Sequence, residues 1–469
     1  MLITKYRLQI LVQALRAILP LAHPADTTLR YFFRNERIGS NERELAAETV
    51  FGVLRHRMLL EHACGVSSPR EKSPIPATAS ISADGAALPA AQGSLRVSGE
   101  PHGAFHAVAP DAVQQRVQAA TPRRMALAWL CRFGGYNLRE LEPVLERDEK
   151  AWLATVKALK ADDLPLAIQA ELPDWLVHML RRSYSDTDIL AIGKSMQQAA
   201  PLDIRVNTLL AKRDDVLQQL REKGIEADAT RYSPVGIRLR EKPALNKDAL
   251  YTGGKIEVQD EGSQLLGFLL APKRNDMVVD FCAGAGGKTL MLSALMNSQG
   301  RLYAMDVSEK RLANLKQRLK RSGASNIQPV LIAHENDLKI KRLAGKIDRV
   351  LVDAPCSGLG TLRRSPDLKF RQSPGTIAES ASRQAAILVS ASRLLKKAGR
   401  LVYATCSILP EENQQIVETF LAGHPEFRLR PAGEILRQQK IPLNMLDYLE
   451  LLPHLHETDG FFAAVIERT

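Results

Sequence analysis

Cysteine is scarce in this chain of 469 residues, and its few positions form no pairing pattern. There are 5 cysteines, and an odd count in so long a chain argues against a disulfide framework and favours a reducing cytoplasm. Because no C-x-x-C pair occurs, a structural zinc site is disfavoured, and we expect no metal.

Long apolar runs are also missing. No run reaches the ~18 residues that a membrane-spanning helix needs. The one stretch that resembles a signal peptide, residues 8–22, is interrupted by Gln9, Gln13 and Arg16 at helical spacing. That spacing predicts an amphipathic core helix, and we expect no contact with a membrane.

Acidic residues are outnumbered. Lys and Arg total 64 against 52 Asp and Glu, which gives a net charge of +12 and a pI near 9.5. An excess of this size favours a polyanionic partner such as RNA or DNA, and the plain alternative is a basic soluble protein. The length exceeds one ordinary core, so two or three domains are expected.

Three regions differ in pattern. Residues 1–150 carry apolar positions at three- and four-residue spacing and predict an all-helical domain, interrupted at about 66–112 by a Ser/Pro/Ala/Gly-rich stretch that we expect to be disordered. Residues 151–255 predict linker helices and a small α+β unit. Residues 256–469 alternate strands with helices, which predicts an α/β fold with a doubly wound, Rossmann-like parallel sheet. Its predicted strands are 277–281, 302–305, 327–332, 349–352 and 400–404.

A glycine-rich loop, residues 280–289, follows the first strand of this sheet. It is not a P-loop, because Cys282 stands where the first Gly of that motif belongs. It is not a dinucleotide fingerprint either, because Thr289 stands where the third Gly belongs. Gly284 and Gly286 would let a ligand approach the backbone closely.

Acidic residues follow the next two strands. Asp306 lies about twenty residues past the loop, where an acid typically binds a ribose hydroxyl. Asp337 follows the third strand, where it would meet an adenine edge. An adenosine ligand without a pyrophosphate is indicated, and S-adenosylmethionine fits. The alternative is a tight strand-to-helix turn with surface acids.

Two cysteines come directly after neighbouring strands of the predicted sheet, Cys356 beside Asp353 and Cys406 after Thr405. Neighbouring strands lie ~5 Å apart, which would bring both thiols to the ligand crevice. One such cysteine would usually be a small buried apolar residue, but two beside an acid favour catalysis.

Thiol chemistry has a clear use at such a crevice. Carbon 5 of cytosine is a poor nucleophile until a thiolate adds to carbon 6 and turns the ring into an enamine-like nucleophile. The attacking thiol needs surroundings that favour its thiolate. Asp353 is placed to hydrogen-bond the ring nitrogen and amine. These residues alone do not rank Cys356 against Cys406 as the nucleophile.

Several segments, in order along residues 170–468, resemble the Sun-type (Fmu-like, NOL/NOP/Sun) RNA cytosine-5 methyltransferases. The helical N-terminus resembles the NusB-type RNA-binding domain of the bacterial ribosomal RNA enzymes in this group. The one departure is Ala285, where the family usually has Pro. The matching segments are Arg205-Val-Asn207, 259–263, the loop 280–289, Asp353-Ala-Pro-Cys-Ser-Gly358, 360–367, Thr405-Cys-Ser407, 410–413 and 459–462.

The resemblance implies a methyl donor, a substrate and roles for the site residues. The cofactor would be S-adenosylmethionine, the partner RNA, with ribosomal RNA expected, and the protein a monomer. Cys406 would be the nucleophile, Cys356 would assist product release, and Asp353 would complete the catalytic set. The implied cofactor contacts are Cys282, Ala283, Gly284, Ala285, Gly286, Gly287, Lys288, Asp306, Asp337 and Asp353.

RNA contacts are expected from four residues near these segments, Arg205, Asn207, Arg363 and Arg364. The two adjacent arginines follow the Pro-Cys loop, where they would hold phosphates. The target cytosine would leave its stack to reach the pocket.

Other readings stay open. A tRNA cytosine substrate fits the same family, and a ribosome-assembly RNA-binding protein without turnover would keep the same fold. An N6-adenine methyltransferase is disfavoured, because Asp353-Ala-Pro-Cys356 stands where that class needs Asn/Asp-Pro-Pro-aromatic.

Overall fold

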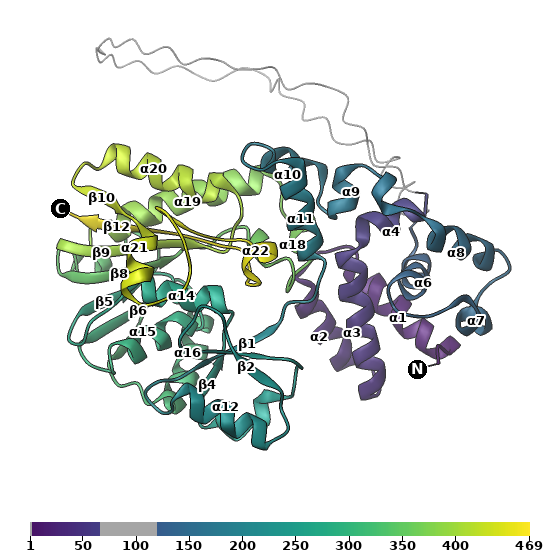
Figure 1. Cartoon of the computed structure of the whole chain (residues 1–469), viewed down its shortest axis with the longest axis horizontal. Helices are drawn as coiled ribbons and strands as arrows, with labels where there is room; N and C mark the ends of the chain where they lie inside the picture. Colours follow the sequence, from purple (N-terminus) through teal and green to yellow (C-terminus); the bar gives the residue numbers. More distant parts are fainter. Residues whose placement is uncertain (1, 66–119) are drawn as a thin grey trace, which may run out of the picture.

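The computed structural model describes residues 2–65 and 120–469; the predicted insertion at about 66–112 lies outside the described residues. The N-terminal region is all-helical, as predicted, and stands to one side of the sheet domain (Figure 1). Its elements are α1 (Lys5–Ile18), α2 (Ala25–Asn35), α3 (Ser40–Arg55), α4 (Arg57–Ala63), α6 (Pro122–Arg132), α7 (Leu138–Leu141), η1 (Glu142–Val144) and α8 (Glu149–Ala158).

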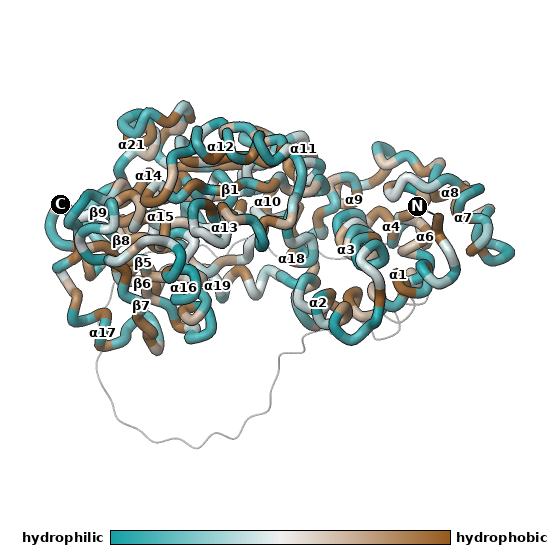
Figure 2. The backbone as a smooth tube through the Cα atoms, turned by 90° about the horizontal axis from the view of Figure 1, so that it is seen from below, coloured by the Kyte–Doolittle hydropathy of each residue, from teal (hydrophilic) through white to brown (hydrophobic). Residues whose placement is uncertain are grey.

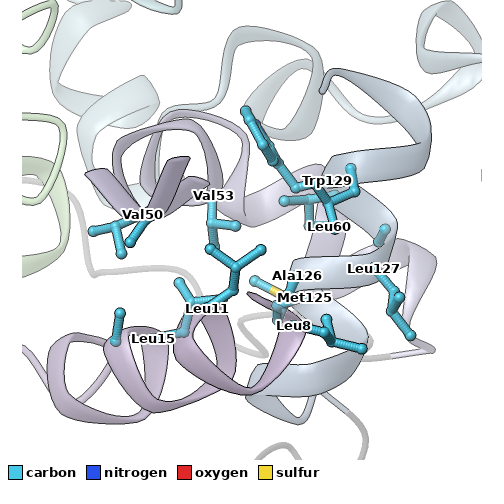
Figure 3. Packing of buried hydrophobic residues seen from close by; sticks show 14 of the residues in the cluster. Leu8, Leu11, Leu15, Val50, Val53, Leu60, Met125, Ala126, Leu127 and Trp129 are labelled. Atoms are coloured by element: carbon cyan, nitrogen blue, oxygen red, sulfur yellow. The ribbon is translucent and has the colours of Figure 1, made fainter. Parts of the chain in front are cut away.

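An apolar core holds these helices together. Leu11 and Leu15 of α1 point toward Val50 and Val53 of α3 (Figure 3). Gly52 of α3 leaves room for the α6 indole, because an added Cβ would lie 2.1 Å from Trp129 Nε1. Helix α8 contributes to the same core, so the domain extends beyond the predicted boundary at residue 150.

A linker of short helices leads to a small four-stranded antiparallel sheet of order β2-β3-β1-β4. Because β4 pairs with β1, this unit extends just past the predicted boundary at residue 255. The linker comprises η2 (Ala161–Asp163), α9 (Leu166–Ala170), α10 (Asp174–Leu180) and α11 (Asp186–Met196). The small unit comprises β1 (Leu202–Val206), α12 (Arg213–Glu222), β2 (Ala227–Ala229), β3 (Gly236–Leu239), η3 (Leu245–Lys247), α13 (Ala249–Thr252) and β4 (Ile256–Val258).

The C-terminal region is the predicted doubly wound sheet, with strand order β10-β12-β9-β8-β5-β6-β7. Helices α19 and α20 cover one face, and α14, α15 and α16 cover the other (Figure 1). The strands are β5 (Met277–Asp280), β6 (Arg301–Asp306), β7 (Ile327–Leu331), β8 (Ile347–Asp353), β9 (Leu395–Thr405), β10 (Phe427–Arg430), β11 (Leu449–Leu451) and β12 (Phe461–Arg468). The helices are α14 (Glu261–Leu270), α15 (Gly287–Leu295), α16 (Glu309–Ser322), α17 (Leu338–Lys341), η4 (Leu359–Thr361), α18 (Leu368–Arg371), α19 (Pro374–Ser392), η5 (Pro410–Glu412), α20 (Gln414–Gly423), α21 (Ala432–Gln438) and α22 (Pro453–His456).

Strand order fixes where a ligand can bind. Strands β7, β6, β5, β8 and β9 are parallel neighbours, and the chain reverses its direction of winding between β5 and β8. In such sheets ligands bind beyond the carboxyl ends of the strands at this switch point. The glycine-rich loop follows β5 and the Pro-Cys loop follows β8, so both border the expected crevice.

The helical domain meets the sheet domain through buried polar groups. Helix α18 lies between the two bodies in both views (Figures 1 and 2). The buried carboxylate of Glu171, which ends α9, accepts hydrogen bonds of 2.9 Å from the backbone N–H groups of Met58 and Leu59. Lys369 of α18 lies 3.6 Å from the same carboxylate and donates to the backbone oxygen of Arg55 at 2.9 Å.

Candidate active site

A pocket opens at the switch point of the sheet. Seven of the ten residues expected at the cofactor line it, and the other three, Gly286, Asp306 and Asp337, do not. Gly286 shapes the loop instead: its φ is 84° and an added Cβ would lie 2.2 Å from Leu315. The lining residues are Gln259, Ser263, Asp280, Cys282, Ala283, Gly284, Ala285, Gly287, Lys288 and Asp353.

Asp280, at the end of β5, is a buried carboxyl group in the pocket wall. Burial raises its pKa from 3.8 to about 7. Its Oδ2 accepts a hydrogen bond of 2.6 Å from the Thr289 hydroxyl, whereas its Oδ1 has no partner in the described residues. A buried acceptor without a partner in a pocket wall suits a ligand that carries hydrogen-bond donors, such as an ammonium group.

The two acids expected at ribose and adenine have partners within the protein. Asp306 ends β6 and accepts from the backbone N–H of Gly284 at 2.8 Å and of Ser308 at 2.7 Å. Asp337 caps α17, and the backbone N–H groups of Lys339 and Ala333 lower its pKa. Asp306 thus supports the glycine loop directly, and the adenine contact of Asp337 stays a prediction.

Lys288 and Asp353 join the glycine loop to the Pro-Cys loop. The Lys288 Nζ lies 2.7 Å from Asp353 Oδ2, and its side chain is 17% exposed against 28% for the acid. Burial alone would lower the pKa of Lys288, but the charge and hydrogen bond of Asp353, together with nearby Cys406, raise it. Lys288 therefore stays a cation near the thiol of Cys406.

The two predicted thiols meet. Strands β8 and β9 are paired with Asp353 opposite Ala404, and the Sγ atoms of Cys356 and Cys406 lie 3.4 Å apart. The contact with Cys406, and then burial, raises the pKa of Cys356 well above its usual value, so this group keeps its proton at neutral pH. Both side chains remain partly exposed.

A third thiol, Cys282, lies in the pocket wall. Burial and the carboxylates of Asp280 and Asp353 raise its pKa well above the usual value. A thiol that stays protonated is a poor nucleophile. Its position therefore fits pocket lining rather than covalent chemistry.

The expected RNA contacts are turned inward. Buried Arg205 donates to Gln259 at 2.5 Å and to the backbone oxygen of Gly287 at 2.7 Å, and burial lowers its pKa to about 10. Buried Asn207 donates to the backbone oxygens of Gly254 and Ser322. Both side chains hold the small sheet against the methyltransferase sheet, and their burial argues against a contact with RNA.

The adjacent arginines are also engaged within the protein. Buried Arg363 lies 3.2 Å from Asp459, and Arg364 binds Asp459 at 2.5 Å and Asp260 at 2.9 Å. For Arg363 the prediction of a phosphate contact conflicts with its burial. Arg364, whose side chain is 33% exposed, keeps it as a prediction.

Sequence reasoning missed several residues of the site. Gln259 and Ser263 line the pocket. Buried Glu412 and Asn413 lie behind the thiol loops. All four fall inside segments that carried the family resemblance, which is the signal that would have marked them.

Relatives are found by sequence and by structure. Residues 267–467 match the family described as 16S rRNA methyltransferase RsmB/F, and residues 172–246 match a ferredoxin-like domain of RsmF/B-like methyltransferases. A probable ribosomal RNA small subunit methyltransferase B of Synechocystis sp. is 34% identical over 329 residues, 69% of this chain and 73% of that protein. One of the same name from Bacillus subtilis is 30% identical over 326 residues, 68% of this chain and 71% of that protein.

Two solved structures show the same fold. The crystal structure of PH0851 covers all of both chains with a TM-score of 0.72 at 24% identity. A methyltransferase homolog protein from Pyrococcus horikoshii covers 63% of this chain and 99% of that one, with a TM-score of 0.52 at 28% identity. Fold and site together define a Rossmann-like methyltransferase. The chain belongs to the RsmB/F family of Sun-type ribosomal RNA methyltransferases, as the resemblance predicted.

Proposed function

We propose that this protein methylates carbon 5 of a cytosine in ribosomal RNA, using Cys406 as a covalent nucleophile and S-adenosylmethionine as donor. The observation that carries the proposal is the pair of thiols, 3.4 Å apart, next to a pocket that suits the donor. Names of the relatives support a ribosomal RNA substrate. Free thiols also fit a reducing cytoplasm.

The pocket offers groups of the right kind for the donor. Asp280 presents a buried acceptor without a partner, which fits an amino group. Asp306 does not line the pocket, but it stands at the end of β6, the position from which an acid typically binds a ribose, and it holds the glycine loop there. When bound, S-adenosylmethionine supplies the methyl group as a sulfonium electrophile.

The chain's own groups act on the pyrimidine. Cys406 adds as a thiolate to carbon 6 of the ring, near the ion pair of Lys288 and Asp353. Addition makes carbon 5 nucleophilic. The partly exposed Asp353 is placed to hydrogen-bond the ring nitrogen and amine.

Release needs a second group at the ring. The carbon 5 proton must leave before the bond from carbon 6 to Cys406 breaks. Cys356, which lies against Cys406, is the group that assists this step in our proposal. Its raised pKa means that it enters this step as a thiol, which donates its proton to the departing Cys406 sulfur while solvent water accepts the carbon 5 proton.

The product identifies the reaction. Purified protein would be incubated with methyl-labelled S-adenosylmethionine and either small-subunit ribosomal RNA or bulk tRNA, and the RNA digested to nucleosides. We expect labelled 5-methylcytidine from ribosomal RNA only. Label in another nucleoside would overturn the chemistry, and label in tRNA alone would overturn the substrate. Bisulfite sequencing of ribosomal RNA from a deletion strain locates the cytosine, which should lose its protection.

A further inference from the structure

The loops that carry the two thiols are held from behind by one turn. The turn joins β9 to α20 and contains η5, and its last two residues are Glu412 and Asn413. Both side chains are buried, at 0% and 4% exposure. Neither lines the pocket at the switch point, which the two thiols adjoin but do not line, and their side-chain hydrogen bonds run to the thiol loops.

Glu412 holds one flank of Cys356. Its Oε1 accepts from the backbone N–H of Ser357 at 2.8 Å, and its Oε2 accepts from the Ser357 hydroxyl at 2.5 Å. The side-chain amide of Gln384 donates both to Glu412 Oε1 and to the backbone oxygen of Pro355, each at 3.0 Å. The carboxylate of Glu412 therefore holds Ser357 directly and Pro355 through Gln384, so both neighbours of Cys356 are fixed.

Asn413 holds Cys406 in the same manner. Its Nδ2 donates to the backbone oxygen of Ser407 at 3.0 Å, and its Oδ1 accepts from the Thr405 hydroxyl at 2.5 Å. Those two residues flank Cys406. The Ser357 and Ser407 hydroxyls, 3.2 Å apart, join the two loops directly.

We infer that Glu412 and Asn413 are positioning residues, one for each thiol, which set where the two sulfur atoms stand around a single pyrimidine. This inference rests on the proposed function, because it assigns each residue to the step of its own thiol. Asn413 serves addition by Cys406, and Glu412 serves release through Cys356. A displacement of about 1 Å at a reacting group costs roughly 100-fold in rate.

The two assignments predict opposite defects. Addition is measured as covalent adduct on small-subunit ribosomal RNA transcribed with 5-fluorocytidine, in which the fluorine blocks release. Release is measured as adduct that accumulates on unmodified RNA. We expect Asn413→Ala to slow adduct formation on fluorinated RNA by roughly 10- to 100-fold. We expect Glu412→Ala to form that adduct near the wild-type rate and to accumulate adduct on unmodified RNA.

Control variants make the test decisive. Glu411→Gln alters the neighbouring carboxylate, which pairs with Arg182, and should behave as wild type. Glu412→Gln keeps the volume and one acceptor, so it should show the Glu412→Ala pattern more weakly and serves if that variant does not fold. Melting temperature and S-adenosylmethionine binding should stay close to wild type in each variant used.

The outcomes separate the two ideas. If Asn413→Ala and Glu412→Gln slow addition and release equally, the residues only stabilise the fold and the inference is wrong. If Cys406→Ala still forms the adduct on fluorinated RNA, the proposed function itself fails, whatever the other variants do.

Discussion

Two pairs of cysteines lie in different regions of the protein, one pair buried and the other partly exposed, and their neighbours differ. In the helical domain Cys64 and Cys131 pack into an apolar core (Figure 3 shows other members of this core), and burial raises the pKa of Cys64 to about 12. At the sheet edge Cys356 and Cys406 touch each other beside Lys288. Contact with a second thiol beside a lysine favours a chemical role, whereas burial among apolar groups, or among acids as at Cys282, favours packing or lining.

The largest difference between the two regions should appear when the proposed nucleophile, Cys406, is replaced. Cys406→Ala should lose all measurable turnover, because in the proposed mechanism Cys406 is the group that adds to carbon 6. Cys131→Ala, the matched change in the helical core, should keep its rate and lose only about 1 kcal/mol of stability. Methyl incorporation into small-subunit ribosomal RNA measures both, and normal turnover by Cys406→Ala would refute the assignment.

The second thiol at the edge should give a different defect. Cys356→Ala should still add to RNA but release it slowly, with steady-state turnover lower by about 10²–10⁴-fold, the usual contribution of an acid–base group. Denaturing gels should show a protein–RNA adduct that Cys64→Ala lacks. Absence of the adduct would assign release to another group.

At the sheet edge, Asp280 should also make the free energy of unfolding depend on pH. The folded-state pKa of Asp280, about 7, lies above its unfolded value of 3.8. Its stabilising contribution is therefore complete below about pH 4 and is lost as pH rises through 7. Asp280→Asn should flatten this dependence and add up to about 4 kcal/mol at pH 8. Chemical unfolding without cofactor at pH 5 and pH 8 measures it, and equal effects at both pH values would contradict the cause.

The smallest expected effect is on the chemical labelling of the two cysteines in the helical core. Cys64 and Cys131 should resist iodoacetamide at pH 8 in the folded protein, because burial raises the pKa of both. Both should react once the chain is unfolded by denaturant. Peptide mass spectrometry reads each site, and rapid labelling of Cys64 in the native protein would show that the helical core opens.

Periodicity predicted what local sequence encodes. The apolar runs placed β5 to β9 within a few residues, and parallel neighbours brought Cys356 and Cys406 together. Strands β2 and β4 were not predicted, because each has only 3 residues, too few to show the alternation of a strand. The apolar run of β12 was readable but was not assigned.

Burial of charge was not predictable in the same way. An arginine reads as a surface cation until its acceptors are known, and those of Arg205 lie 54 and 82 residues away. Glu412 likewise reads as a solvent-exposed acid, since Ser357 is 55 residues distant. Long-range hydrogen bonds of this kind follow from the tertiary structure, not from local pattern.

The contacts of Glu171 and Lys369 join the helical domain to the sheet domain, and this joint affects how the molecule unfolds. If the two bodies parted, Glu171 would stay with the linker helices that pack on the sheet domain and would lose its backbone donors Met58 and Leu59. Lys369 would keep Glu171 but lose the backbone oxygen of Arg55. A hydrogen bond to a charged group contributes about 1.5–3 kcal/mol, so losing these three penalises separation before either core melts. The joint therefore couples the melting of the two bodies, which favours a single calorimetric transition over two.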